Sequence, residues 1–137
     1  MPSVIPMLAY ADGPAAMDWL IEAFGFTERE RWIGDDGLLS HGELRAGADG
    51  RIFLATPSPA YEGPKRHREH CAEAAAWQQV PYIVDGVMVA VDDLDAHLEH
   101  ARAAGARILS EIEDPGLGFR EYRAEDPEGH RWMFTGK

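Results

Sequence analysis

Glu128-Gly129-His130-Arg131-Trp132-Met133-Phe134 is a tight turn followed by an apolar strand, and Asp49-Gly50-Arg51-Ile52-Phe53-Leu54 gives the same pattern in the first half of the chain. A helical stretch precedes each one, at residues 12–25 and, 80 residues later, at 92–105. Such a period is typical of a duplicated module. The sequence therefore predicts an α+β protein of tandem βαβββ modules, whose curved mixed sheets surround a cleft, with one helix per module packed on the outer face.

Each predicted helix begins at an aspartate and ends at a glycine. Asp12 can cap the first, and Asp92 or Asp93 the second, while Gly25 and Gly105 supply the left-handed stop. Apolar residues recur at helical spacing between these ends. Runs of strand-like composition flank the helices, and the predicted strands are residues 3–10, 27–33, 38–45, 51–56, 87–91, 107–112, 119–125 and 130–135.

The repeat divides the chain into a first module (1–56), a long connection (57–85) and a second module (86–137), which together form one predicted structural domain. The connection opens with a loop and continues into a predicted helix at 67–79. Its Tyr61, Trp77 and Tyr82 indicate packing, and a connection this long in a small domain is usually functional or disordered. We expect it to form a lid, or an arm over a partner subunit.

Composition excludes several functions. The 137 residues include 24 acidic and 13 basic ones, and the net charge of −11 argues against nucleic-acid binding. That charge suits a cationic ligand, or it simply belongs to a solvated surface. Cys71 is the only cysteine, so no internal disulfide can form, and the longest apolar run, residues 87–91, is too short to span a membrane. We expect a cytoplasmic protein without membrane contact.

The two modules, with Asp12 opening the first helix and the stretch Asp126-Pro127-Glu128-Gly129-His130-Arg131-Trp132 near the end, resemble the vicinal oxygen chelate superfamily. That superfamily includes glyoxalase I, extradiol dioxygenases, methylmalonyl-CoA epimerase and bleomycin-resistance proteins. The resemblance covers nearly the whole chain except residues 57–85, and is closest to small bacterial members labelled PhnB-like or glyoxalase-like. It implies the fold, but no particular reaction, because this scaffold hosts many chemistries. It also implies a homodimer.

In metal-dependent members of that superfamily, four strands each contribute one His or Glu to a metal ion. By resemblance, the corresponding positions here are Ile5, Gly86, Met133, and either Phe53 or Leu54. None of these side chains is a ligand for the hard or borderline cations that the superfamily uses, since the methionine thioether suits copper(I). We therefore expect no metal at the superfamily's site and no cofactor.

Apolar residues replace those ligands. Strand alternation places Ile5 and Met7 on one face and Met88 on another, and clefts lined by methionine adapt to flat or irregular hydrophobic ligands. Aromatic residues at the mouth of the cleft, among them Tyr61 and Trp77, are candidates for stacking, as in the resistance proteins. Alternatively, the cleft is filled and forms ordinary core. The predicted ligand-binding residues are Ile5, Met7, Trp32, His41, Phe53, Met88, Phe119 and Met133.

His41 and Glu43 share one face of a predicted strand, where the carboxylate could position the histidine as a general base. They could equally orient a ligand by hydrogen bonds, or simply face solvent. His67, His70 and Cys71 have helical spacing, but no known zinc motif matches them and their neighbours are basic, so a solvated helix is the preferred interpretation.

Together with the resemblance, which implies a homodimer, the sequence favours a protein that binds a small organic molecule and sequesters an antibiotic or a metabolite. That molecule is expected to be hydrophobic or planar, and the net charge suits a cationic one. The alternative is a glyoxalase-like lyase or isomerase, or another enzyme, that uses His41 and Glu43 or a displaced metal site.

Overall fold

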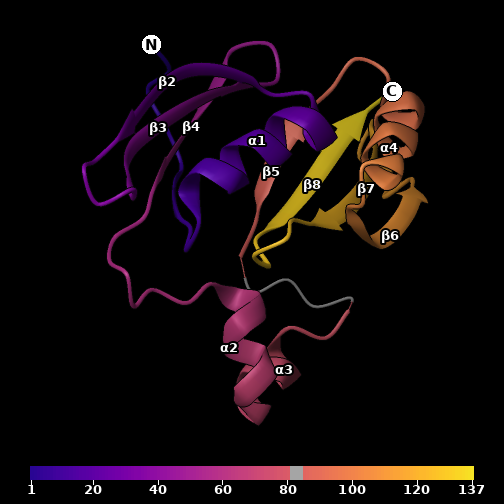
Figure 1. Ribbon diagram of the computed structural model, residues 1–137. Helices are drawn as coiled ribbons and strands as arrows, with labels where there is room; N and C mark the ends of the chain where they lie inside the picture. The colour runs from indigo at the N-terminus through magenta and orange to yellow at the C-terminus, as the bar shows by residue number, and fades with distance from the viewer. Residues whose placement is uncertain (81–84) are drawn as a thin grey trace. The chain divides into compact units, whose positions relative to one another are not determined.

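The computed structural model describes residues 1–80 and 85–137. The chain forms two compact units, Met1–Gly63 and Pro64–Lys137 (Figure 1). The first contains β1 (Met7–Ala9), α1 (Gly13–Phe24), β2 (Thr27–Ile33), β3 (Leu39–Ala46) and β4 (Gly50–Ala55). The second contains α2 (Pro64–His70), α3 (Ala72–Trp77), β5 (Val87–Ala90), α4 (Leu94–Ala103), β6 (Arg107–Glu113), β7 (Arg120–Glu125) and β8 (Arg131–Gly136). The predicted βαβββ duplication is confirmed.

The two sheets have the same topology. The first has the order β1-β4-β3-β2 and the second β5-β8-β7-β6, with one parallel pair in each, β1 with β4 and β5 with β8. The parallel registers are also equivalent, since Met7 lies beside Phe53 in one sheet and Met88 beside Met133 in the other. In both units the connection between the parallel strands carries the module's helix, as a parallel pair requires.

Helix α1 covers one face of the first sheet, packing against β2, β3 and β4 (Figure 1). The Asp12 side chain caps it by accepting a hydrogen bond from the Ala15 N–H at 3.1 Å, and Gly25 ends it with φ of 74°. Helix α4 is capped in the same way, by Asp93, whose carboxylate accepts from the Ala96 N–H at 3.0 Å. The core on the helix side of the two sheets consists of Met17, Leu20, Phe24, Leu44, Ile52, Leu54, Leu94, Leu98, Tyr122, Trp132 and Phe134.

The connection differs from its prediction. The single helix expected at 67–79 is two short helices, α2 and α3, which are interrupted at Cys71 because this residue has extended backbone angles. The Lys65 N–H donates to the Glu128 carbonyl at 3.0 Å, so α2 begins against the turn between β7 and β8. These helices therefore belong to the second unit, while Tyr82 lies outside the described residues. Whether they act as a lid or a dimer arm stays a prediction.

The first strand is also shorter than expected. Residues 3–10 were predicted to form a buried strand, but β1 spans only Met7–Ala9, and Val4 and Met7 are exposed. The strand lies at the edge of its sheet, as Pro6 predicts, and pairs there with β4. Among the helices described in residues 1–80 and 85–137, none has the length and apolar character that a membrane crossing needs.

Candidate functional site

Strand alternation gives the first sheet a covered face and an open face. Leu44, Ile52 and Leu54 are buried on the side of α1. Their neighbours along the strands, including Glu43 on β3 and Phe53 on β4, point to the opposite side, which no helix of this unit covers. We call this side the open face.

Three rings and a methionine form a row across the open face. The ring of His41 lies 5.2 Å from that of Trp32 and 4.8 Å from that of Phe53, measured between ring centroids. Met7 lies beside Phe53 across the parallel pair. Trp32 is 59% exposed and Met7 79%, so this apolar surface is open to a ligand. We call these four residues the aromatic row.

His41 is held by a buried carboxylate. Its Nε2 lies 2.8 Å from Glu43 Oε1, and the Arg29 Nε–H donates to Glu43 Oε2 at 3.1 Å. Arg29 reaches this face because the β2–β3 register shifts between Glu28 and Glu30, which is the effect of a β-bulge. The hydrogen bond from His41 and the charge of Arg29 keep the pKa of the Glu43 carboxyl below its usual value, although burial opposes this.

Glu30 lies directly opposite Glu43 and completes a cluster. One ligand atom from each of Glu30, His41 and Glu43 lies within 4.8 Å of the other two, close enough to surround a divalent cation. Two of these residues were predicted as site residues from the sequence, but Glu30 was missed, since nothing in the sequence gives the register of β2 on β3.

The second sheet also has an open face, with a small pocket of about 130 Å³. Met88 and Met133, which are register partners, line it together with Gly86 and Leu109. Arg123 lies at the same pocket, and its Nε is buried without a hydrogen-bond partner in the described structure. The pocket is therefore mainly apolar, with two arginines, Arg123 and Arg131, among its lining residues.

A family model described as the Glyoxalase/Bleomycin resistance protein/Dioxygenase superfamily matches residues 5–134. The chain belongs to this superfamily. An uncharacterised protein of Mycobacterium bovis is 30% identical over 135 residues, which are 96% of this chain and 80% of that protein. The crystal structure of TioX from Micromonospora sp. ML1 is similar at 31% identity and a TM-score of 0.71, covering 99% of this chain and 98% of that chain. UcmS2 shares the fold at 17% identity and a TM-score of 0.67, with 98% of both chains covered.

The superfamily's metal positions do not fit a metal in this member. The structure removes the ambiguity between Phe53 and Leu54, since Phe53 lies on the open face and Leu54 is buried towards α1. Phe53, Gly86 and Met133 offer neither the oxygen nor the nitrogen donors that such a site needs, and Ile5, which precedes β1, offers none either.

The other predicted site residues are scattered. Phe119 lies in the bend before β7 and is half-buried, as is Ile5. His67 and His70 are exposed neighbours on α2, and within residues 1–80 and 85–137 no third potential metal ligand lies beside them. The structure thus brings Met7, Trp32, His41 and Phe53 together in one unit, and Met88 with Met133 in the other.

Proposed function

We propose that this superfamily member binds a planar, hydrophobic small molecule on the open face of its first sheet, and that it acts as a homodimer that sequesters an antibiotic or a metabolite. The aromatic row is the observation that carries the proposal. An exposed Trp, a His, a Phe and a Met lie in one line, with ring centroids about 5 Å apart, and the flat surface of a planar molecule fits such a line.

The row also offers polar groups, among them the imidazole of His41. Glu43 holds His41 in a fixed orientation, so the imidazole can present its second nitrogen to a ligand without losing conformational entropy on binding. A planar molecule with one polar edge would therefore use the rings for contact area and the imidazole for orientation. Similarity to TioX over nearly its whole length supports a shared scaffold.

A ligand-binding experiment tests the proposal. At 100 times its Kd, a bound planar probe should stabilise the protein by about 2.7 kcal/mol, which thermal shift detects. We expect 2-naphthamide to bind, and Trp32→Ala to weaken that binding about 2- to 10-fold, because one stacking contact contributes about 0.5–1.5 kcal/mol.

Trp77→Ala is the matched control, since Trp77 on α3 is 57% exposed against 59% for Trp32. It removes an equally exposed indole that is not part of the aromatic row, and should leave the Kd unchanged. Equal losses in both variants, or no stabilisation of the wild type by either 2-naphthamide or the cationic planar 9-aminoacridine, would contradict the proposal.

The Glu30–His41–Glu43 cluster favours a second candidate function, an enzyme that uses a displaced metal site or His41 as a base. Zinc titration by calorimetry distinguishes this candidate, and we expect one Zn²⁺ to bind if it is correct. Glu30→Gln should then weaken zinc binding at least tenfold, because it removes one of the three ligands but leaves the His41–Glu43 hydrogen bond in place. Binding that is absent, or unchanged in Glu30→Gln, would exclude the metal version.

A further inference from the structure

Two arginines of the first unit differ from the other nine arginines, because they have no acidic partner among residues 1–80 and 85–137. Of the eleven arginines, nine form an ion pair with Asp or Glu. Arg45 and Arg51 form no ion pair with any residue in the described part of the chain. Because acidic residues outnumber basic ones by 24 to 13, an unpaired guanidinium group is unexpected in this protein.

The two arginines are also direct neighbours on adjacent strands. Arg45 on β3 is the register partner of Arg51 on β4, and Thr27 on β2 continues the same row. Like charges directly opposite each other on neighbouring strands are destabilising. An anion bound between the two guanidinium groups would convert this repulsion into two charge-assisted contacts.

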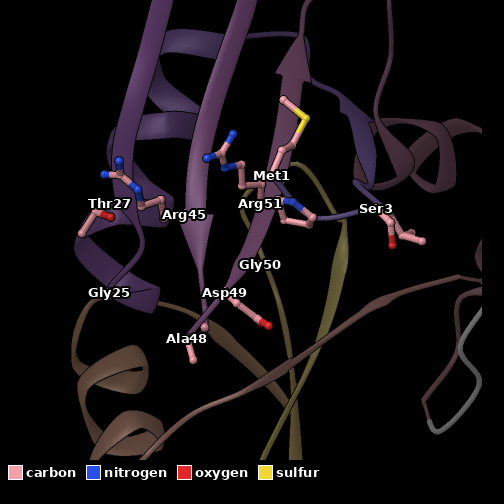
Figure 2. A pocket seen from close by; sticks show the side chains of 12 residues that line it. Met1, Ser3, Gly25, Thr27, Arg45, Ala48, Asp49, Gly50 and Arg51 are labelled. Carbon is pink, nitrogen blue, oxygen red and sulfur yellow. The ribbon is translucent and has the colours of Figure 1, made fainter.

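A pocket of about 820 Å³ lies at this pair. Residues 1–4 line one side of it, and Arg45, Arg51 and Thr27 line another. Figure 2 shows the two guanidinium groups extending from neighbouring strands into the same region, with the Thr27 hydroxyl beside Arg45. Asp49 also lines the pocket, but no hydrogen bond or ion pair in the described structure joins it to either arginine.

The arginine pair lies close to the aromatic row. Arg51 precedes Phe53 by two residues on β4, and Arg45 follows Glu43 by two residues on β3, so all four side chains share the open face. Two residues along a strand correspond to about 7 Å. A single small molecule can therefore reach both the rings and the arginines.

We propose that Arg45 and Arg51 bind the oxyanion, a carboxylate or a phosphate, of the small molecule whose planar part lies on the aromatic row. This inference rests on the proposed function and specifies its ligand as a planar organic acid. An anionic ligand is the opposite of the cationic ligand that the net charge of −11 suggests. Charges more than a Debye length away, about 8 Å at physiological salt, are largely screened, so the local balance of charge decides. Near the pair, Glu43 already binds Arg29, and the lining of the pocket has two arginines against one aspartate, Asp49.

Matched probes test the inference. 2-Naphthoate and 2-naphthamide share one ring system and differ mainly in charge, while 2-naphthyl phosphate distinguishes a phosphate site from a carboxylate site. We expect the wild type to bind the better of the two anions at least tenfold more tightly than the amide, since a hydrogen bond to a charged group contributes strongly. The double variant Arg45→Gln/Arg51→Gln should lose this preference and bind the amide with an unchanged Kd.

Arg66→Gln/Arg102→Gln is the control, because it removes two exposed arginines of the second unit and gives the same net charge, −11 − 2 = −13. It should retain the preference for the anion.

Three results would overturn the inference: equal binding of anion and amide by the wild type, a preference that survives in Arg45→Gln/Arg51→Gln, or tighter binding of 9-aminoacridine than of both anions. Anion binding that depends on Arg45 and Arg51 but not on Trp32 would support the anion site and contradict the proposed function of the aromatic row.

Discussion

Replacing Glu125 with glutamine is expected to lower the free energy of unfolding by about 3–5 kcal/mol, because it leaves buried cationic groups without their counter-charge. Glu125 is 2% exposed and pairs with three arginines. Arg68 on α2 makes a bidentate contact at 2.6 and 2.8 Å, and the Arg131 Nε–H donates at 3.2 Å from a nearly buried position. Urea unfolding followed by circular dichroism measures the loss.

Glu113→Gln is the control for this experiment. Glu113 ends β6 at an exposed position, and its side chain forms no hydrogen bond or ion pair in the described structure, so the same chemical change should alter stability by less than about 0.5 kcal/mol there. If both variants lose equal stability, the arginine cluster does not hold the second unit together.

The pH dependence of the Glu125→Gln effect follows from the same cluster. Burial would raise the pKa of Glu125, but the hydrogen bonds from Arg68 and the charges of Arg107 and Arg131 outweigh it and lower this pKa. A carboxyl whose folded-state pKa is lowered contributes stability above its unfolded pKa, and this contribution is lost as pH falls through the folded value. The stability difference between wild type and Glu125→Gln should therefore be largest near neutral pH and shrink under strongly acidic conditions.

The features that the sequence predicted correctly are set by residues close together along the chain. Capping aspartates, left-handed glycines and helical spacing placed α1 and α4 within one or two residues, because these signals act within a single turn of chain. Alternation along β3 also placed His41 and Glu43 on one face. The contact between His41 and Glu43 could therefore be predicted from the sequence.

The features of the site that the sequence did not predict are set by the pairing of strands. The bulge between Glu28 and Glu30 brings Arg29 onto the open face, and the β3–β4 register places Arg45 against Arg51. Neither bulge nor register has a local signal here, since any one-residue slip is compatible with the same composition. His97 illustrates the same limit: its Nδ1 lies 2.6 Å from the Tyr122 hydroxyl, a contact between α4 and β7 that helical spacing alone does not indicate.

Gly129→Ala is expected to destabilise the second unit by about 2–5 kcal/mol, combining backbone strain with a steric clash. Gly129 has φ of 93°, and an added Cβ would lie 2.4 Å from the Lys65 nitrogen, which is backbone and cannot rotate away. The same nitrogen donates to the Glu128 carbonyl, so the alanine would push α2 off the β7–β8 turn. Urea unfolding gives the change in stability, and limited proteolysis within residues 64–80 reports the release of α2 and α3.

Gly118→Ala separates the two contributions. Gly118 has nearly the same φ, 88°, but an added Cβ there meets no atom within 4 Å, so only the backbone strain of about 1–3 kcal/mol applies. The excess loss in Gly129→Ala then measures how firmly α2 is held on the turn. A large excess with enhanced proteolysis means that the connection is a fixed part of the second unit. If the two variants lose equal stability and Gly129→Ala shows no new cleavage within residues 64–80, α2 moves away from the turn freely, as a lid or a dimer arm must.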